Sequence, residues 1–526
     1  MRVLVTDNLD PIGAEVLRKE ESIEVDVIND ISADALLETI GAYDGLIVRS
    51  RSKVTAAVIE AGTNLKVIGR AGTGVDNIDV AAATRRGIVV MNAAAGNTVT
   101  TAEHAIALMM AMARNIPIAS STTKSGLWEK KKFTGVEVCH KTLGIVGMGK
   151  IGSVVASRAI GLGMQVVCYD PYLTAEQAAK AGVERATLDD LFARSDFITV
   201  HTPLTSETKG IIGRDAFSKM KKGVRIVNCA RGGLVDEAAL YDAIIEGKVA
   251  GAALDVYEKE PVAADHPLLS LDAVIATPHL GASTGEAQAG VAVLIAEEMA
   301  EYLVRGTIRG AVNFPAIGPE QLEQIRPYLS LGEKLGSFLG QAFGYDLNEI
   351  EIEFGGDVAE YDVRPIADAV LTGMLTPVIE RINFVNASVI AAERGIRVRQ
   401  TTDRHARDYA STVTVRTKAE NVEHEAVGAV FGSRDVRLVR VDGFTIEAIP
   451  DGHLVLTRSR DVPGVIGRIA TSLGDSGINI GRFYLGRQQE GHEALALIQV
   501  DGPVDDAQIA QIAALPNILS ARRIEL

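Results

Sequence analysis

The sequence predicts a multidomain α/β protein whose first part holds parallel sheets and whose last part is a small ferredoxin-like sheet. The chain has 526 residues, enough for three or four domains at ~100–200 residues each. Short runs rich in Val and Ile alternate with helical patterns across residues 1–310, which indicates parallel sheets covered by helices on both faces. The order strand–helix–strand–strand–helix–strand over residues 452–526 is typical of a ferredoxin-like sheet.

The composition favours a cytoplasmic globular protein. The net charge of −15 argues against non-specific nucleic-acid binding, so any anionic ligand needs a local basic pocket. No run of ~18 apolar residues predicts a membrane helix, and the opening MRVLVTDNLDPIG is typical of a buried strand rather than a signal peptide. Three widely spaced cysteines predict neither disulfides nor a metal site, and they favour a reducing compartment.

The first group of expected strands alternates with helices. Strands are expected at 2–7, 24–29, 45–50, 65–72 and 88–94, with helices at 10–20 and 33–42. A long helix at 100–115 follows. Because this helix is apolar on nearly all sides, we expect it to be buried between two domains.

A second group of strands ends in polar or glycine-bearing loops. These strands are expected at 141–149, 164–171, 197–203, 224–233, 249–257 and 273–283. A second long helix runs from about 284 to 304, and the prolines and glycine of VNFPAIGPEQ then indicate a domain boundary. Residues 318–450 mix helices with alternating strands and predict an intervening α+β domain, in which no chemical constellation stands out.

The stretch LGIVGMGKIG predicts a dinucleotide site. Gly147, Gly149 and Gly152 have the G-x-G-x-x-G spacing, follow a strand and open an apolar helix whose N-terminus can face a pyrophosphate. Asp170 ends the next strand, 18 residues after Gly152, where an acid grips a ribose 2′-hydroxyl. No cation directly follows Asp170, and its carboxylate would repel a 2′-phosphate. The predicted cofactor is therefore NAD rather than NADP.

Three strand-end loops each carry one candidate catalytic residue: Arg231, Glu260 and His279. Oxidation of a hydroxy acid needs a base for the hydroxyl proton, a partner that orients the base, and a cation for the carboxylate. Histidine suits the first role, a carboxylate beside it the second, and a guanidinium fork the third. Taken singly, His279 could be a loop cap, Glu260 a solvated turn residue and Arg231 a partner of Asp236.

The motifs NCARGGLVDE, AALDVYEKEP and TPHLGAST, together with VGMGKIG, resemble those of the D-isomer-specific 2-hydroxyacid dehydrogenase family. The resemblance implies a Rossmann-type NAD-binding domain (98–283) inserted into a flavodoxin-like substrate-binding domain (1–97 with 284–313). It also implies that Arg231, Glu260 and His279 are the catalytic triad. The cofactor-contacting residues implied by the motifs are Thr73, Gly147, Gly149, Lys150, Ile151, Gly152, Asp170, Thr202, Pro203, Cys229, Ala230, Asp255, Gly281 and Ala282.

The substrate implied by the resemblance is a phosphorylated hydroxy acid, because the whole chain is similar to long family members that oxidise 3-phospho-D-glycerate to 3-phosphohydroxypyruvate, the first step of L-serine synthesis. Cations for the phosphate are expected in two strand-end loops, with Arg49 and Ser50 in one and Arg70 and Gly72 in the other. In the family, cations from the stretch that holds Lys130 and Lys131 reach the neighbouring subunit's site, which implies a homo-oligomer, a dimer or a tetramer.

Two other functions fit the same motifs. A glyoxylate or hydroxypyruvate reductase would use the same triad, but it needs neither the phosphate cations nor the tail domains. An NAD-sensing corepressor-like binding protein would share the dehydrogenase core without a terminal ferredoxin-like unit. Turnover of phosphorylated and unphosphorylated keto acids, compared side by side, separates these functions.

The last 75 residues resemble an ACT regulatory domain through RSRDVPGVIG and INI. In ACT domains of this family the positions of Asp461 and Asn479 bind L-serine at a domain interface and give feedback inhibition. The sequence leaves open a dimerisation module without a ligand. Ser459 stands where some serine-sensitive relatives have an aromatic residue.

Overall fold

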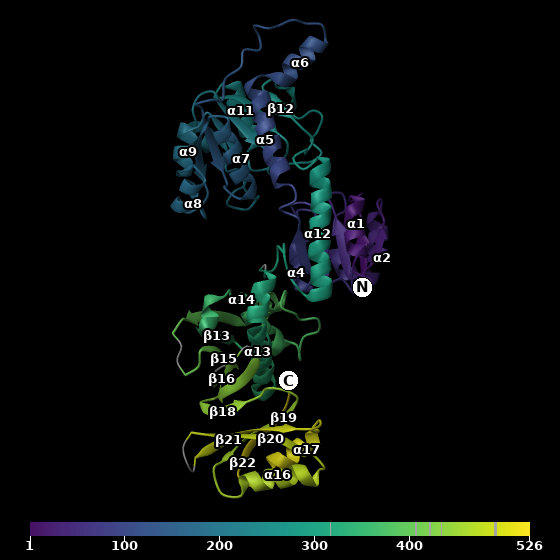
Figure 1. Cartoon of the computed structure of the whole chain (residues 1–526), viewed down its shortest axis with the longest axis vertical. Helices are drawn as coiled ribbons and strands as arrows, with labels where there is room; N and C mark the ends of the chain where they lie inside the picture. Colours follow the sequence, from purple (N-terminus) through teal and green to yellow (C-terminus); the bar gives the residue numbers. More distant parts are fainter. Residues whose placement is uncertain (316, 406–407, 420–421, 433, 489–491) are drawn as a thin grey trace.

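The computed structural model describes residues 1–526 apart from 316, 406–407, 420–421, 433 and 489–491. The described residues form four β-sheets, of five, seven, six and four strands, and each sheet with its helices is called a unit here. Figure 1 shows an elongated molecule with the seven-stranded unit at one end and the four-stranded unit at the other. No described helix combines the length and the apolar character needed to cross a membrane.

The five-stranded unit holds the N-terminus. Its strands are parallel and lie in the order β2-β1-β3-β4-β5, which is the flavodoxin-like order predicted for the substrate-binding part. Its strands are β1 (Arg2–Val5), β2 (Glu24–Val27), β3 (Gly45–Val48), β4 (Val67–Arg70) and β5 (Val89–Asn92), and its helices are α1 (Pro11–Arg18), α2 (Ala33–Thr39), η1 (Ile40–Ala42), α3 (Ala56–Ala61) and α4 (Val80–Arg85). Strand β3 is buried throughout, because helices cover both faces of the sheet.

The seven-stranded unit is also parallel, in the order β12-β11-β10-β9-β6-β7-β8. The strand order reverses between β6 and β9, as in the Rossmann fold, and this reversal opens a crevice at the carboxyl ends of the strands. The strands are β6 (Thr142–Val146), β7 (Gln165–Tyr169), β8 (Glu184–Arg185), β9 (Phe197–Val200), β10 (Val224–Asn228), β11 (Val249–Leu254) and β12 (Val274–Ala276), and the helices are α7 (Lys150–Gly161), α8 (Ala175–Lys180), α9 (Leu188–Arg194), α10 (Arg214–Lys219), α11 (Glu237–Ile245) and η2 (Pro267–Ser270).

Two long helices connect these units. Helix α5 (Thr98–Ala113) leaves the five-stranded unit and packs against α7 and β11, and α6 (Ile116–Lys124) follows it. Helix α12 (Gly285–Arg305) returns from the seven-stranded unit and packs against α1 and β4 (Figure 1). The prediction that α5 is buried on nearly all sides is only partly right. Its Ala102–Met112 face is buried, but Val99 is 50% exposed, because α5 packs against neighbours on one side only.

The six-stranded unit follows α12. Its order is β14-β13-β15-β16-β17-β18, with one parallel pair at β13–β14 and antiparallel pairs elsewhere, so the predicted α+β character is confirmed. Its elements are α13 (Pro319–Phe343), β13 (Glu349–Gly356), η3 (Asp357–Glu360), α14 (Arg364–Leu375), α15 (Ala387–Glu393), β14 (Arg397–Asp403), β15 (Ser411–Ala419), β16 (Val422–Phe431), β17 (Asp435–Val441) and β18 (Phe444–Ala448). Helices α13 and α14 pack against each other in this unit, and leucines and a phenylalanine of α13 contribute to its buried core.

The four-stranded unit has the predicted βαββαβ order. Its antiparallel sheet, β20-β21-β19-β22, has ferredoxin-like topology. The elements are β19 (His453–Arg460), α16 (Val465–Asp475), β20 (Ile480–Arg487), β21 (Glu493–Val500), α17 (Asp506–Ala513) and β22 (Ile518–Glu525). Strand β20 also packs against β18 of the six-stranded unit.

The six-stranded unit contacts the five-stranded unit at the C-terminal end of α4. Asn383 donates its side-chain amide to the carbonyl of Gly87 at 2.8 Å, and Asn386 donates to the carbonyl of Arg85 at 3.1 Å. The domain boundaries expected from the sequence stay predictions, because the sheets and helices do not by themselves fix where one domain ends.

Candidate active site

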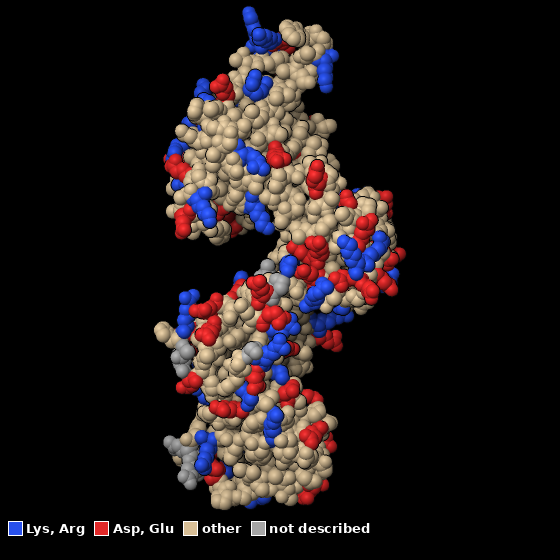
Figure 2. Space-filling view, viewed as in Figure 1, with Lys and Arg blue, Asp and Glu red and all other residues tan. Residues whose placement is uncertain are grey.

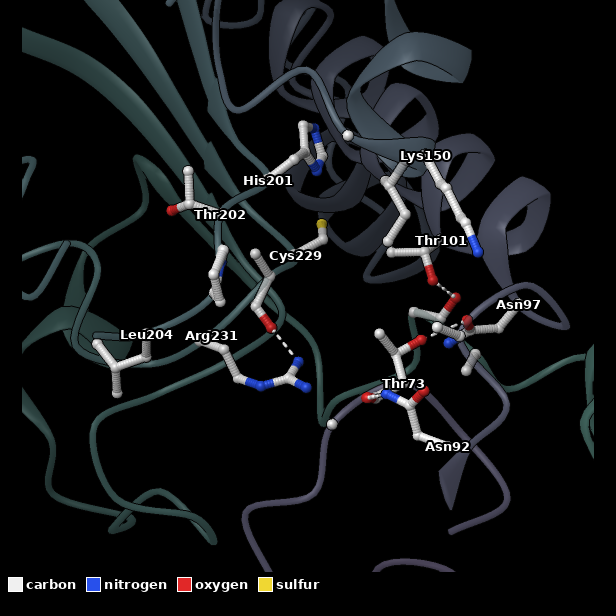
Figure 3. Close-up of a pocket in the computed structure, with 18 of the residues that line it drawn as sticks. Thr73, Asn92, Asn97, Thr101, Lys150, His201, Thr202, Leu204, Cys229 and Arg231 are labelled. Carbon is white, nitrogen blue, oxygen red and sulfur yellow. Dashed lines mark hydrogen bonds between the residues drawn. The ribbon is translucent and has the colours of Figure 1, made fainter. Parts of the chain in front are cut away.

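A cavity of about 530 Å³ lies between the seven-stranded and five-stranded units. Loops after β9, β10 and β12, the start of α7 and the segment after β4 line it (Figure 3). Twelve of the predicted site residues line this cavity: Thr73, Gly149, Lys150, Ile151, Thr202, Pro203, Cys229, Ala230, Arg231, His279, Gly281 and Ala282. The catalytic and cofactor predictions therefore meet in one place, although their roles stay predictions.

The glycine fingerprint has the geometry that a dinucleotide needs. Gly147 adopts a φ of 97°, and a Cβ on Gly152 would lie 2.1 Å from the carbonyl oxygen of Gly147. No heavy atom lies within 4 Å of the Cβ position of Gly149, so the space in front of the α7 N-terminus is open. An open helix N-terminus with free N–H groups suits a pyrophosphate.

Asp170 lies directly after β7, outside the cavity lining. Its two carboxylate oxygens accept hydrogen bonds from the backbone N–H groups of Met148 and Tyr172, both at 2.9 Å. These bonds fix the carboxylate next to the glycine loop. The arrangement suits acceptance from ribose hydroxyls and opposes a 2′-phosphate.

Buried polar atoms in the cavity wall lack partners among the described residues. Thr202 Oγ1 and His201 Nδ1 are both buried without a hydrogen-bond partner among the described residues. The other ring nitrogen, His201 Nε2, lies 2.9 Å from Thr199 Oγ1. Burial lowers the pKa of His201 to about 4, so its imidazole is neutral and can accept a hydrogen bond. Burial raises the pKa of the Cys229 thiol, so that side chain is no nucleophile. A dinucleotide would satisfy these orphaned atoms, and the wall therefore fits NAD.

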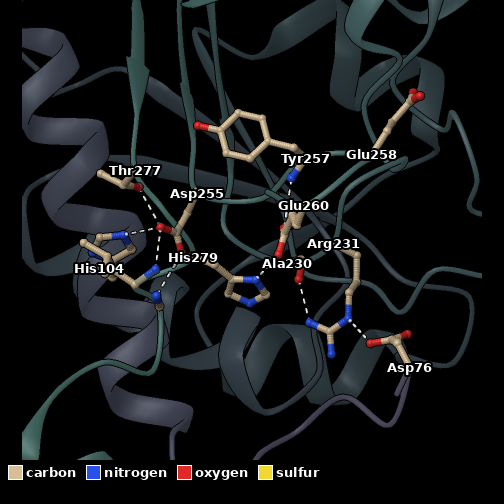
Figure 4. A network of polar contacts seen from close by, with 12 residues as sticks. Asp76, His104, Ala230, Arg231, Asp255, Tyr257, Glu258, Glu260, Thr277 and His279 are labelled. Atoms are coloured by element: carbon tan, nitrogen blue, oxygen red, sulfur yellow. Dashed lines mark hydrogen bonds and ion pairs between the residues drawn. The ribbon is translucent and has the colours of Figure 1, made fainter. Parts of the chain in front are cut away.

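His279 and Glu260 form a close pair at the cavity edge (Figure 4). His279 Nδ1 lies 2.7 Å from Glu260 Oε2, and Glu260 Oε1 accepts from the backbone N–H of Tyr257 at 3.1 Å. His279 has a φ of 57°, an uncommon conformation that its N–H bond to the Asp255 carbonyl at 2.9 Å helps to hold. The imidazole is therefore fixed by its ring partner and its backbone, which leaves Nε2 for substrate.

Asp255 is fully buried behind the loop that carries His279. Its carboxylate accepts from the Thr277 hydroxyl at 2.6 Å and from the N–H groups of Leu280 and Gly281, both at 2.8 Å. His104 Nε2 of α5 lies 3.2 Å from the same carboxylate. Burial opposes ionisation of Asp255, but His104, Thr277 and Leu280 lower its pKa below the ordinary value. The Asp255 carboxylate thus holds the loop that carries His279 through several hydrogen bonds.

Arg231 projects into the cavity from the loop after β10. Its Nη1 donates to the Ala230 carbonyl at 2.7 Å, and its Nε donates to Asp76 Oδ2 at 3.1 Å. The Asn228 side-chain amide holds the loop by donating to the Arg231 carbonyl at 2.9 Å. The suggested pairing with Asp236 is wrong, because Asp236 instead caps α11 by accepting from the Ala239 N–H at 2.9 Å.

The predicted phosphate-binding residues Arg49, Ser50, Arg70 and Gly72 belong to the five-stranded unit and are not among the residues that line the cavity, although Arg70 lies within electrostatic reach of Arg231. Arg70 ends β4, its Nε is buried without a hydrogen-bond partner in the described residues, and a Cβ on Gly72 would lie 1.7 Å from its Nη1. Burial and the nearby charge of Arg231 lower the pKa of Arg70 to about 10, and Arg49 adds to this effect. Ser50 is exposed beside Arg49.

The loop that holds Arg49 is braced from two sides. The Arg49 N–H donates to Asp7 Oδ2 at 2.9 Å, and the Asn77 side-chain amide donates to the Arg49 carbonyl at 2.8 Å. Asn77 belongs to the segment between β4 and α4, which also carries Asp76. The loop that offers the Arg49 cation is therefore linked by a side chain to the segment that contacts Arg231.

Lys130 and Lys131 do not line the cavity of their own chain. Both are exposed in the loop after α6, where Trp128 is 85% exposed. Figure 2 shows Lys and Arg side chains gathered at the end of the molecule where Figure 1 places α6.

Asp461 and Asn479 lie in the four-stranded unit but are not hydrogen-bonded to each other. The Asn479 amide donates to Asp501 Oδ2 at 2.6 Å, and Arg487 Nη1 lies 3.5 Å from Asp461 Oδ2. The structure therefore places both side chains beside other charged groups of the same unit.

In the described part of the chain, no group of three His, Cys, Asp or Glu side chains is arranged to hold a metal ion.

Several site residues were not predicted from the sequence. The polar cavity residues missed are Asp76, Asn92, Asn97, Thr101 and His201, together with His104, which contacts Asp255. Asp76 and His201 follow strands β4 and β9, so their strand-end positions carried a signal that could have identified them.

Comparison with known proteins places the chain in one family. Residues 106–281 match the family profile "D-isomer specific 2-hydroxyacid dehydrogenase, NAD binding domain", which confirms NAD as the cofactor. Residues 324–442 match "D-3-phosphoglycerate dehydrogenase intervening domain".

Two curated relatives and one solved structure extend the match. The chain is 43% identical over its full length to a D-3-phosphoglycerate dehydrogenase of Synechocystis sp., of which it covers 95%, and 43% identical to that of Archaeoglobus fulgidus, of which it covers 100%. A glyoxylate reductase from Paecilomyes thermophila matches with a TM-score of 0.55 and 31% identity, over 61% of this chain and 99% of that one. The chain therefore belongs to the D-3-phosphoglycerate dehydrogenase family of D-isomer-specific 2-hydroxyacid dehydrogenases.

Proposed function

We propose that the protein oxidises 3-phospho-D-glycerate to 3-phosphohydroxypyruvate with NAD as the hydride acceptor. The observation that carries this proposal is a cavity lined by Arg231 and by His279, which pairs with Glu260 at 2.7 Å, with Arg70 nearby within electrostatic reach of both Arg231 and Arg49. A hydroxy acid needs the first two features, and a phosphate needs additional cations. NAD, when bound at the glycine loop, supplies the electron sink of the reaction.

Each side chain of the cleft has one task in this proposal. Arg231 binds the substrate carboxylate with the guanidinium edge that Asp76 and Ala230 leave open. His279 Nε2 accepts the proton of the substrate hydroxyl, and Glu260 keeps the opposite ring nitrogen in a hydrogen bond, so that the imidazole faces the hydroxyl and its positive charge is stabilised. Asp255 holds the backbone on both sides of His279.

Replacing Arg49 with alanine tests the phosphate role. We expect kcat/KM for 3-phosphohydroxypyruvate in the reverse reaction to fall by about ten- to a hundredfold, the value of one charge-assisted contact. The same variant should keep its kcat/KM for unphosphorylated hydroxypyruvate, because that substrate has no group to contact Arg49. NADH absorbance measures both rates, and an equal loss on both substrates contradicts the phosphate role.

The same assay separates the rival functions. The wild-type protein should turn over 3-phosphohydroxypyruvate with a higher kcat/KM than glyoxylate or hydroxypyruvate. A preference for glyoxylate would make the protein a reductase of unphosphorylated acids, as the name of the Paecilomyes relative suggests for that protein. Absence of turnover with all three acids, combined with tight NAD binding, would favour an NAD-sensing binding protein.

Assembly and location belong to the same proposal. We assign Lys130 and Lys131 to the active site of a neighbouring subunit in a homo-oligomer, a dimer or a tetramer, because their exposed loop lies away from their own cavity. The three free cysteines support the cytoplasmic location expected from the composition.

The four-stranded unit is proposed to bind L-serine near Asp461 and Asn479. Both residues flank α16, one before and one after it, and each already contacts a charged group that an amino acid could replace. Millimolar L-serine is expected to lower the initial rate, and the Asp461→Ala variant should lose this response while its rate without serine is unchanged. A flat serine titration of the wild type would leave the unit as an assembly module.

A further inference from the structure

Asp76 contacts Arg231 across the cleft. Asp76 lies in the segment between β4 and α4 of the five-stranded unit, and Arg231 follows β10 of the seven-stranded unit (Figure 4). Asp76 Oδ2 accepts from Arg231 Nε at 3.1 Å. The Asp76 side chain is 75% exposed and the Arg231 side chain 26% exposed. An ion pair this open adds little to the stability of the fold, so its value lies in where it holds the guanidinium.

The surrounding charges explain why a carboxylate belongs there. Arg70 is within electrostatic reach of Arg231 and of Arg49. Two carboxylates, Asp76 and Asp7, oppose this repulsion. Asp7 is held against the Arg49 loop, because its Oδ2 accepts a hydrogen bond from the Ser52 N–H at 2.9 Å. Asp76 is therefore the carboxylate that can oppose repulsion at Arg231 itself.

The contact leaves one edge of the guanidinium free. Nε is occupied by Asp76 and one hydrogen of Nη1 by the Ala230 carbonyl, so the Nη1–Nη2 edge remains for a carboxylate. Nη2 lies against the backbone of Gly74, where an added Cβ would be 1.9 Å from it. Gly74 thus leaves room for the Arg231 guanidinium, and Asp76, two residues later, accepts a hydrogen bond from its Nε.

We propose that Asp76 is a positioning residue that orients Arg231 for the substrate carboxylate and carbonyl. The inference rests on the proposed function, because it gives Arg231 a substrate to orient. Asp76 touches neither substrate nor cofactor in this role. Its negative charge also opposes the entry of an anionic substrate, so it improves the geometry of the guanidinium at the expense of electrostatic attraction.

The Asp76→Asn variant separates these two effects. We expect kcat with 3-phosphohydroxypyruvate to fall by about ten- to a hundredfold, because the guanidinium loses its charge-assisted partner. The KM of this polyanionic substrate should fall by about threefold, because one repelling charge near the site is removed and screening limits the gain. High salt should abolish the fall in KM and leave the fall in kcat. The Asp76→Glu variant should recover part of kcat.

Two further variants provide the controls. Glu15→Gln removes the same charge from an exposed position of α1 and should change neither constant. Gly74→Ala displaces the Arg231 guanidinium without changing any charge. Its kcat should therefore fall, but its KM should not show the fall expected for Asp76→Asn. Thermal unfolding should leave Asp76→Asn within a few degrees of the wild type, since the side chain is exposed.

The outcomes keep the two proposals apart. If the wild type turns over 3-phosphohydroxypyruvate but Asp76→Asn has the kcat of the Glu15→Gln control, Asp76 does not position Arg231. A parallel rise in KM and fall in kcat, with lowered thermal stability, would also overturn the positioning role and make Asp76 a structural residue. If the wild type fails to turn over this substrate, the proposed function itself is wrong.

Discussion

Alanine in place of His279 is expected to lower kcat by about 10²–10⁴-fold, the range supplied by a positioned acid–base group. The imidazole lines the cavity and is held against a carboxylate, with Nδ1 at 2.7 Å from Glu260 Oε2. Without it, the substrate hydroxyl proton has no acceptor at that place. Stopped-flow measurement of the hydride step, in either direction, gives this loss directly.

The loss should be confined to chemistry. Because the proposed task of His279 is proton transfer rather than cofactor binding, the Kd of NADH measured by fluorescence should stay within about twofold of the wild type. His405→Ala, which removes a largely exposed imidazole from the six-stranded unit, is the matched control and should keep full activity. A His279→Ala protein with more than a tenth of the wild-type kcat would mean that another group accepts the proton.

Alanine at Gly232 is expected to reduce kcat/KM by at least ~100-fold and to destabilise the fold by about 1–3 kcal/mol, as overpacking does. A Cβ there would lie 1.8 Å from the carbonyl oxygen of Tyr257 and 2.7 Å from the backbone nitrogen of Glu258. Both obstacles are main-chain atoms, so no side chain can rotate away and the two loops must separate. One loop carries Arg231 and the other carries Glu260, so the separation disrupts the catalytic geometry.

Gly161→Ala is the matched control for this substitution. Its Cβ position has no heavy atom within 4 Å, and the residue lies at the C-terminal end of α7. Activity should be unchanged and the melting temperature equal or slightly higher, because alanine favours a helix more than glycine does. Wild-type kcat/KM in Gly232→Ala would mean that the two loops can separate without affecting the reaction.

Local patterns made much of the site predictable. The spacing of Gly147, Gly149 and Gly152 reports one strand–helix turn, so a few residues of sequence are enough to place it. Arg231 and His279 could be placed because parallel strands bring their carboxyl ends to a common edge. The alternation of strands and helices predicted the parallel character of the first two sheets, and the βαββαβ element order predicted the ferredoxin-like sheet.

Contacts between distant segments could not be predicted in this way. Asp76 and Arg231 lie 155 positions apart, and only the packing of two units against each other brings them together. The same holds for His104, which reaches Asp255 because α5 crosses from one unit to the other. A single sequence shows the residue types of such pairs but not how the two units pack against each other. For this reason Asp236, a near neighbour in sequence, was a plausible but wrong partner for Arg231.

Helix α4 lies between the segment that holds Asp76 and the residues that contact the six-stranded unit. Its N-terminal end is capped by Asp79, whose Oδ1 accepts from the Ala82 N–H at 2.9 Å, only three residues beyond Asp76. At its other end, Asn383 and Asn386 of the six-stranded unit donate hydrogen bonds to the backbone carbonyls of Gly87 and Arg85. A six-residue helix is about 9 Å long, so its two ends lie close together. The contact between Asp76 and Arg231 and the contacts with the six-stranded unit are therefore separated by one helix of fewer than two turns.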